Sequence, residues 1–419
     1  MKIRLRDLRL IDKPNDFFDL LIEDGYIRYK GPSSKFPKLN CDRTYDLKGN
    51  FVSAGWVDMR ALCGEPGYEH KETIASLTET AKKGGFTHVC VMPNTKPVIN
   101  QKSDLQYFIK KSQDTGVILH PLAAATIDTK GEDLSEMLDL HAHGAIAFSD
   151  GLHPVHNADR LLKILQYLSK FDGLLINHSH DPLLNLFGMM HEGEISTRLG
   201  LKGMPSLAEE VAIMRDLELL RYAGGKMHFT CISTARSVSL IKEAKKEGLN
   251  VTCDVAAYHL LLTDHDLMSF DTNYKVNPPL RTESDVKALI KGLKDGVIDA
   301  IVSNHQPVNV EGKDLEFDLA DFGMINLQTV FSQLVALEKQ VSLELLLKKI
   351  SEEPRKILGL PIVNLLEGEM ADLTIFDPTA IWRYDQNSNT SVSENSPFLG
   401  QELKGKVTGT VLGTKININ

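Results

Sequence analysis

Short apolar runs alternate with longer amphipathic stretches through the middle of this chain of 419 residues. The amphipathic stretches predict helices: in ARSVSLIKEAKKEG, Val238, Leu240, Ile241 and Ala244 fall on one helical face, and Gly248 follows as a stop signal. Eight apolar runs separated by such helices predict an α/β fold, a parallel (β/α)8 TIM-like barrel. The runs read FVSAGWVDM, THVCVMP, LHPLAAATI, AIAFSD, GLLINHSHD, MHFTCIST, VTCDVAAYHLLL and DAIVSNHQP.

The two ends of the chain differ from its middle. Residues 1–50 and 367–419 hold β-rich fragments and turns. Because chain ends usually lie close together, we expect them to pair into one small β-sheet domain, with the barrel occupying residues 51–366. A doubly wound open sheet is the alternative to the barrel. No GxGxxG follows the first strand, however, and eight repeated units favour closure.

Composition and charge narrow the function classes. Hydrophobic residues make up 42% of the chain and charged residues 25%, which is ordinary for a globular protein. The net charge of -9 argues against a nucleic-acid partner. We find neither a signal peptide nor an apolar run near the roughly 20 residues that span a membrane. The five cysteines lack CxxC spacing, which indicates reduced thiols, so we expect a cytoplasmic protein without a membrane partner.

Polar residues gather where the predicted barrel strands end. Chemistry in such a barrel takes place at the carboxyl ends of its strands, so this clustering predicts a functional site there. The residues at these strand ends are Asp58, Arg60, Leu62, Asn94, Ser149, Asp150, His178, Ser179, His180, Asp181, His228, Cys231, Ser233, His259, Asn277, Arg281, Ser303, Asn304 and His305.

A set of stretches spread along nearly the whole chain matches one known family. They read GWVDM, EPGYEHKETI, GGFTHVCVMPNTKPV, AFSDG, INHSHD, CISTARSV, NPPLR, DGVIDAIVSNHQP, GEMADLTIFDP and SPFLGQELKGKV. Together they resemble a dihydroorotase of the cyclic amidohydrolase family, within the amidohydrolase superfamily. The resemblance implies the barrel, a place in pyrimidine biosynthesis, and zinc as the cofactor of the family.

The metal site of that family is altered in this chain. Family members end strand one with Asp-x-His-x-His, and both histidines hold zinc. Arg60 and Leu62 stand at these positions, and neither side chain can ligate zinc. His178 keeps the histidine of strand five, whereas Cys231 replaces that of strand six. Asn304 stands at the aspartate that binds metal and acts as general base, and a neutral amide takes no proton from water near pH 7.

The pattern for binding the substrate is also incomplete. Gly64 stands where the family pattern has an arginine for the substrate carboxylate, and Val308 stands where it has a histidine. The expected remnants of the substrate pocket are Asn94, Asn277, His305 and Arg60. Asn94 and Asn277 also have plainer local roles, because an Asn satisfies turn amides and Pro278 and Pro279 fix their loop.

These replacements predict a dismantled site. Metal-activated hydrolysis needs a Lewis acid and a proton acceptor, so we expect no catalytic residue, no metal and no cofactor. We expect Arg60 to form an ion pair with Asp150 or Asp58. The residues left for one residual zinc ion are His178, Cys231 and Asp150. The strand-four carboxylate of the family corresponds to Asp150 or Gly151, and the sequence leaves both registers open.

Three further patterns imitate functional sites. His141 and His143 form an HxH, but they precede strand four and so fall at the structural end of the barrel. His180 lies two residues after His178 at the correct end, where the two could form a relocated site, but a His180 that faces solvent or pairs within the loop is the simpler interpretation. Cys63 lies beside Glu65, and we interpret it as a packed thiol rather than a nucleophile.

Three functional hypotheses follow. The first, which we favour, is a non-catalytic dihydroorotase-like protein, a pseudoenzyme that forms a homo-oligomer. The resemblance implies aspartate transcarbamoylase, or another protein of the pyrimidine pathway, as its structural partner. The second is an active dihydroorotase, or another cyclic amide hydrolase, with a rewired mononuclear zinc site. The third is a sensor that binds a small anion through Arg60.

Overall fold

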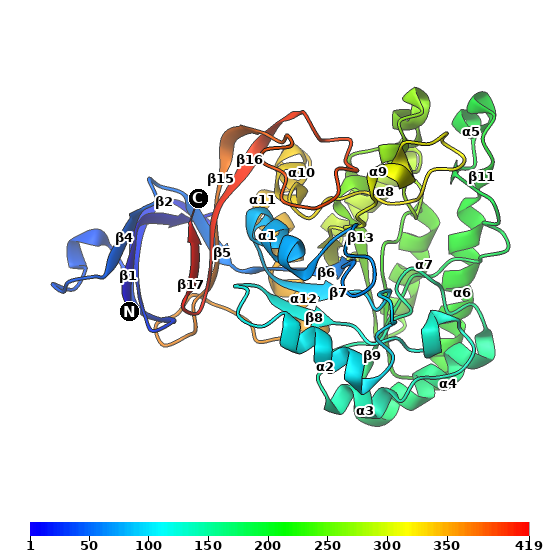
Figure 1. Cartoon of the computed structure of the whole chain (residues 1–419), viewed down its shortest axis with the longest axis horizontal. Helices are drawn as coiled ribbons and strands as arrows, with labels where there is room; N and C mark the ends of the chain where they lie inside the picture. Colours follow the sequence, from blue (N-terminus) through cyan, green and yellow to red (C-terminus); the bar gives the residue numbers. More distant parts are fainter. Residues whose placement is uncertain (419) are drawn as a thin grey trace.

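The two ends of the chain pair in one sheet. The computed structural model describes residues 1–418, and both termini lie in this sheet at the left of Figure 1. Its strand order is β17-β16-β15-β5-β1-β2-β3, with β4 paired to β1. The strands are β1 (Lys2–Leu10), β2 (Lys13–Glu23), β3 (Tyr26–Gly31), β4 (Arg43–Asp46), β5 (Phe51–Ala54), β15 (Asp372–Arg383), β16 (Glu402–Leu412) and β17 (Lys415–Ile418). Buried aliphatic side chains, among them Leu5, Leu20, Val52 and Leu373, form its core.

The apolar run from Phe51 to Met59, which the sequence predicts as one strand, is two strands in the structure. Strand β5 pairs with β15 and β1 of the terminal sheet, and β6 (Trp56–Ala61) enters the barrel. Gly55 separates them, because a Cβ at this position would lie 1.9 Å from Asp372 Oδ1 and 2.1 Å from Thr87 Oγ1. The change of sheet therefore requires a residue without a side chain, a constraint that hydrophobic patterning does not reveal.

Parallel strands form the barrel. They are β6, β7 (Phe86–Val91), β8 (Ile118–Pro121), β9 (Leu174–Asn177), β12 (Lys226–Phe229), β13 (Val251–Ala256) and β14 (Ala300–Val302). Strands β6 to β8 form one sheet, and β9, β12, β13 and β14 form another. Phe148 bridges Ala123 after β8 and Leu175 in β9, while Ala61 bridges His305 after β14. Phe148 thus marks the fourth strand position, and the ring closes, which confirms the predicted fold class.

Helices cover the outside of the barrel in Figure 1. They are α1 (Ile74–Gly84), α2 (Lys102–Lys111), α3 (Met137–Ala142), α4 (Ala158–Leu168), α6 (Ser206–Ala223), α7 (Ala235–Lys246), α8 (Glu283–Lys294), α10 (Val330–Ala336), α11 (Leu343–Ile350) and α12 (Glu352–Leu358). Loops at the barrel rim carry β10 (Met190–His191), α5 (Glu194–Leu199), β11 (Gly203–Met204) and α9 (Val310–Lys313). Helix α7 has the predicted buried face, and Thr234 caps it by accepting a hydrogen bond from the Ser237 amide.

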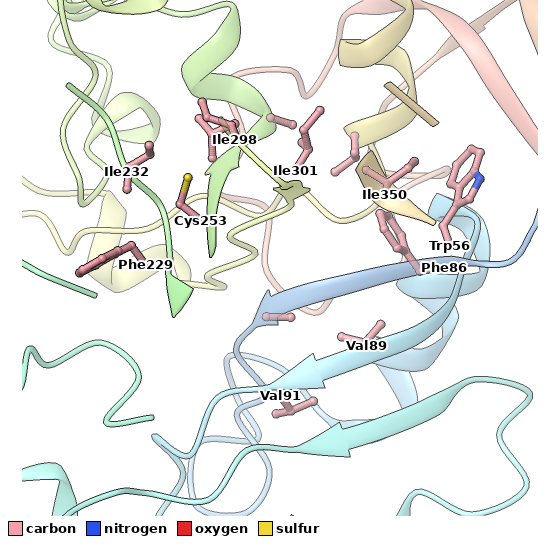
Figure 2. Packing of buried hydrophobic residues seen from close by; sticks show 14 of the residues in the cluster. Trp56, Phe86, Val89, Val91, Phe229, Ile232, Cys253, Ile298, Ile301 and Ile350 are labelled. Atoms are coloured by element: carbon pink, nitrogen blue, oxygen red, sulfur yellow. The ribbon is translucent and has the colours of Figure 1, made fainter. Parts of the chain in front are cut away.

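Aromatic side chains pack the barrel against the terminal sheet. Trp56 is fully buried, and its ring centroid lies 5.1 Å from that of Phe331 and 5.5 Å from that of Phe376. Figure 2 shows Trp56 and Phe86 close to Ile350 in the continuous apolar core. Large aromatic contacts of this kind hold the barrel against the sheet. Within residues 1–418, no helix has the length and apolar character needed to cross a membrane.

Candidate functional site

Arg60 lies at the carboxyl end of β6 with 1% of its surface exposed. Its Nε donates a hydrogen bond of 2.9 Å to Asn304 Oδ1. Its Nη2 donates a long hydrogen bond of 3.4 Å to the carbonyl oxygen of Gly151. The guanidinium therefore connects the ends of the first, fourth and eighth strands of the barrel.

Asn304 is held from several directions at the end of strand eight. Its Oδ1 accepts from Arg60 and, at 2.8 Å, from Gln306 Nε2. Its Nδ2 donates to the Tyr258 hydroxyl at 2.7 Å and to the Asn277 carbonyl at 3.5 Å. The backbone φ of Asn304 is 47°, in the left-handed region that Asn tolerates better than most residues. These bonds fix the amide as an acceptor toward Arg60 and a donor toward Tyr258.

The expected ion pair of Arg60 does not form. Asp150 Oδ1 accepts from the Thr126 amide at 2.9 Å, and its Oδ2 accepts from the Thr126 hydroxyl at 2.6 Å. Asp58 makes the same two-point contact with the amide and hydroxyl of Ser303, at 2.7 and 2.6 Å. Burial raises the pKa of Asp58 to about 7 and that of Asp150 to about 6. The two carboxylates are thus bound by neighbouring loop residues, which corrects the expectation from sequence.

Two histidines at the end of β9 lie beside this cluster. The ring centroids of His178 and His180 are 4.8 Å apart, with an interplanar angle of 59°. The Nδ1 atom of each is buried without a hydrogen-bond partner in the structure. Burial, followed by the positive charge of Arg60, lowers the pKa of His178 well below its ordinary value. Burial lowers the pKa of His180 to about 4. Both rings are therefore neutral near pH 7.

Cys231 is a buried thiol at the end of β12. Its backbone φ is 55°, and its amide donates to Asp254 Oδ1 at 2.6 Å. Burial raises the pKa of the Cys231 thiol far above its ordinary value. A protonated thiol is a poor metal ligand, because metals bind the thiolate. The environment of Cys231 is that of a packed apolar residue.

A cleft of about 390 Å³ opens above these strand ends. Its lining residues are Leu62, Cys63, Gly64, Tyr68, Lys71, Asn94, Leu152, His153, Gln306, Pro307, Val308, Asp321 and Phe322. Leu62 and Val308 give it apolar walls. A Cβ at Gly64 would lie 2.1 Å from the Tyr68 carbonyl oxygen, so this loop conformation leaves no room for an arginine there.

The expected pocket remnants are engaged by the protein itself. Asn94 lines the cleft, but its Nδ2 donates to the Asp150 carbonyl at 3.2 Å and its Oδ1 accepts from the Leu152 amide at 3.0 Å. His305 is fully buried, and its Nε2 contacts Glu72 Oε2 at 3.1 Å. Asn277 contributes its backbone carbonyl to Asn304. Their observed contacts are with loops and strands of this chain.

Two of the three imitating patterns, the HxH of His141 and His143 and the thiol of Cys63, lie outside the cluster, whereas His180 lies beside it with His178. His141 lies in α3, and its Nδ1 contacts the Ala145 carbonyl at 3.1 Å. The Nδ1 of His143 contacts the Asp139 carbonyl at 2.7 Å. Cys63 borders the cleft as a buried side chain, and burial raises the pKa of its thiol above the ordinary value. Such a thiol is not an activated nucleophile.

Comparison with known proteins identifies the family. A family model described as Dihydro-orotase-like matches residues 49–237. A dihydroorotase of Geobacter metallireducens is 39% identical over 422 residues, which cover 99% of each chain. A dihydroorotase of Pelotomaculum thermopropionicum is 42% identical over 402 residues, covering 95% of this chain and 93% of the relative. The chain belongs to the dihydroorotase family.

Solved structures agree with this fold. L-hydantoinase from Arthrobacter aurescens superposes with a TM-score of 0.86 at 23% identity, covering 99% of this chain and 95% of that one. Dihydropyrimidinase from Brevibacillus agri superposes with a TM-score of 0.82 at 20% identity, with the same coverage. At these identities the likeness concerns the fold, and it matches the barrel and terminal sheet of the dihydroorotase family.

The comparisons contradict our expectation that no cofactor belongs with this chain. Its full-length relatives are named dihydroorotase, and zinc is the cofactor that the resemblance to that family implies. The side chains at the strand ends, however, do not fit this ion as they are arranged. Residues 1–418 contain no group of three or more His, Cys, Asp or Glu side chains placed to hold a metal. The guanidinium of Arg60 also adds positive charge beside His178.

Sequence reasoning missed four contributors to this dihydroorotase-family site. They are Tyr258 and Gln306, which bind Asn304, Thr126, which binds Asp150, and Glu72, which contacts His305. Glu72 and Gln306 lie in stretches that carry the family resemblance, EPGYEHKETI and DGVIDAIVSNHQP, and this was the available signal for them. Thr126, Tyr258 and Gln306 lie at the ends of apolar runs, where patterning predicts a strand but not the partner of a side chain, so their contacts emerge only once the barrel is closed.

Proposed function

We propose that this member of the dihydroorotase family does not hydrolyse dihydroorotate and acts in pyrimidine biosynthesis as a structural partner of aspartate transcarbamoylase. The observation that carries the proposal is the state of Asn304. Its amide oxygen accepts two hydrogen bonds and its amide nitrogen donates to Tyr258. An amide has no basic site near pH 7, so it cannot deprotonate a water molecule.

The neighbouring residues do not replace this base. The carboxylates of Asp58 and Asp150 are each bound by a backbone amide and a hydroxyl. His178 is a neutral ring buried beside Arg60. Gly64 and Val308 offer the cleft no polar side chain for a substrate carboxylate. The proposal therefore rests on a missing proton acceptor together with missing substrate contacts.

An exposed apolar segment supports a role in assembly. The loop after β9 carries Leu183 and Phe187, which are 79% and 73% exposed, together with the exposed Leu184 and Leu186. Grouped apolar side chains on a surface commonly mark a protein contact. Aspartate transcarbamoylase is the partner that the family resemblance implies. We also propose that the chain forms a homo-oligomer, which light scattering on the chain alone tests.

Two measurements test the proposal. Dihydroorotate hydrolysis is assayed with zinc supplied, alongside the Geobacter metallireducens dihydroorotase; we expect no turnover above buffer. The chain is then mixed with aspartate transcarbamoylase from its own organism and analysed by size exclusion with light scattering; we expect co-elution. Phe187→Asp should abolish co-elution, whereas Tyr222→Asp, at an exposed position on α6, should not.

Each outcome bears on a separate half of the proposal. Zinc-dependent turnover would refute the non-catalytic half. Separate elution at concentrations of tens of micromolar would refute the named partner, since stable interfaces commonly bind more tightly than this. Equal loss of co-elution in both variants would show that the apolar loop is not the contact surface.

A further inference from the structure

We infer that Arg60 binds a small carboxylate at the carboxyl ends of the barrel strands, at the position of the altered metal site. This inference does not depend on the partner proposed above. It concerns a binding site that the family pattern does not contain, because the family has a histidine where this chain has Arg60.

Arg60 has more hydrogen-bond donors than acceptors around it among residues 1–418. A guanidinium carries five N–H donors and no acceptor. The Nε–H of Arg60 binds Asn304, and one Nη2–H reaches the Gly151 carbonyl at 3.4 Å. The remaining N–H groups, two on Nη1 and one on Nη2, have no acceptor among residues 1–418. Arg60 therefore has the capacity for a further acceptor.

The positive charge of Arg60 is buried without an opposite charge among residues 1–418. No carboxylate among the described residues lies within ion-pair distance of Arg60, because Asp58 and Asp150 are bound to Ser303 and Thr126. A guanidinium remains charged at any physiological pH. Burying it without an opposite charge costs several kcal/mol. A bound anion with a single negative charge compensates this charge without requiring a second cation.

The two histidines at the end of β9 also have unpaired ring nitrogens among residues 1–418. The Nδ1 atoms of His178 and His180 are buried and have no hydrogen-bond partner. A neutral imidazole carries one N–H donor, and its tautomer follows the group that it meets. The rings of His178 and His180 also contact the backbone carbonyls of Leu152 and His178, respectively, so Nδ1 donates to an anion in the tautomer that gives up this carbonyl contact.

The shape of the site selects the class of anion. Gln306 and Leu152 line the cleft, and each is adjacent to a partner of Arg60: Gln306 binds Asn304, and Leu152 follows Gly151. The cleft thus borders the partners of Arg60, although the Arg60 side chain itself is 1% exposed and does not line it. The planar fork of arginine matches the two oxygens of a carboxylate. The walls formed by Leu62 and Val308 suit an apolar body attached to that carboxylate.

Isothermal titration calorimetry with sodium benzoate, at constant ionic strength and in a buffer free of carboxylates, tests this inference. We expect saturable binding to the wild-type chain at one site, and at least a tenfold weaker affinity in Arg60→Met. Arg221→Met removes an exposed arginine that pairs with Glu247, and it should bind benzoate like the wild type. Equal affinity in wild type and Arg60→Met would overturn the inference, as would the absence of binding to the wild type.

Two further measurements keep the test decisive. If Arg60→Met does not fold, Arg60→Gln takes its place, since its amide retains a donor toward Asn304, and the same tenfold loss is expected. The imidazole ¹⁵N resonances of His178 and His180 should shift when benzoate is added to the wild type. Binding that leaves both resonances unchanged places benzoate elsewhere and contradicts the assignment.

Discussion

Two buried arginines lie at opposite ends of the barrel and are compensated differently. Arg60 is 1% exposed at the carboxyl ends of the strands, and an amide oxygen and a carbonyl oxygen are its partners. Arg355 is 2% exposed on α12, facing the start of β6. Its Nη2 donates to Asp372 Oδ2 at 2.7 Å and to the Gly55 carbonyl at 2.9 Å. Of these two arginines, only the second has a carboxylate partner among residues 1–418.

The different partners of the two arginines indicate a structural role for Arg355 and a binding role for Arg60. Asp372 also contacts His88 Nε2 at 2.9 Å, so strands of the barrel and of the terminal sheet meet at one ion pair. Burial alone would raise the pKa of Asp372, but its contacts with His88 and Arg355 hold it below the ordinary value. At the Arg355 end of the barrel, the carboxylate of Asp372 therefore compensates the positive charge of the guanidinium. The Arg60 end leaves a positive charge without a carboxylate among residues 1–418, and this charge, rather than unpaired donors, distinguishes it, since Arg355 Nε is itself buried without a partner.

The largest change in the free energy of unfolding is expected when the ion pair between Arg355 and Asp372 is broken. Arg355→Met leaves Asp372 buried without its cation, and removing one partner of a buried pair costs about 3 to 5 kcal/mol. Urea denaturation at pH 7 should show this loss in the free energy of unfolding. A loss below about 1 kcal/mol would mean that the pair does not hold the barrel against the sheet.

Replacing Arg60 by methionine should raise the free energy of unfolding, which is opposite to the effect expected at Arg355. Arg60→Met removes an uncompensated buried charge, and Asn304 Oδ1 retains its hydrogen bond from Gln306. In buffer without carboxylates, the free energy of unfolding should rise by about 1 to 3 kcal/mol. Arg355→Met is the matched control, since it makes an identical change at a similarly buried position. Destabilisation of both variants by similar amounts would remove the distinction between the two ends.

The sequence predicted the architecture of the protein better than it predicted the contacts of the buried arginines. Eight apolar runs indicated the barrel, because periodic patterning reports which face of an element is buried. The sequence also placed Arg60, His178 and Asn304 at one end of that barrel, since strand order fixes which residues share an end. Patterning did not divide Phe51 to Met59 at Gly55, because the need for glycine comes from Asp372 and Thr87 across the sheet boundary.

Sequence reasoning also did not predict the partners of the buried charges, because these partners come from segments that are distant in the chain. We expected Arg60 to pair with Asp150 or Asp58, as opposite charges near each other often do. Thr126 and Ser303 bind these carboxylates instead, and they come from loops 24 and 245 residues away. A hydroxyl leaves no periodic or charge signal, so the competition between a threonine and an arginine for one carboxylate is decided by the folded geometry.

Lys313 offers an intermediate case, a buried cation held by carbonyl oxygens. Its Nζ donates to the carbonyls of Thr272 and Asp321 at 2.8 Å each. Burial, with a smaller effect from the charge of Lys275, lowers its pKa to about 7. Above pH 7 the unfolded chain, in which a lysine has a pKa of about 10.4, binds more protons than the folded chain. The free energy of unfolding should therefore rise with pH through this window.

Urea denaturation at pH 7 and pH 9 measures this rise. The wild type should gain about 2 kcal/mol more than Lys313→Met over this interval, since one pKa unit corresponds to about 1.4 kcal/mol. Comparing the two proteins cancels the other groups that titrate in the same range. A variant that gains as much as the wild type would show that Lys313 keeps its proton in the fold, and that carbonyl oxygens compensate a buried cation as well as a carboxylate does.

The smallest change in the free energy of unfolding is expected at an exposed ion pair in the terminal sheet. Arg6 Nη2 lies 3.8 Å from Asp46 Oδ2, and both side chains are about half exposed. Asp46→Asn removes the charge but keeps an oxygen that can accept from the Lys48 amide, as Asp46 Oδ1 does at 3.2 Å. Water already solvates both ions, so the free energy of unfolding should change by less than about 0.5 kcal/mol. If urea denaturation instead gave a loss near that of Arg355→Met, burial would not be what makes the Asp372 pair strong. The charge on Arg60 would then carry no comparable cost, and the argument that it requires an anion would lose its energetic basis.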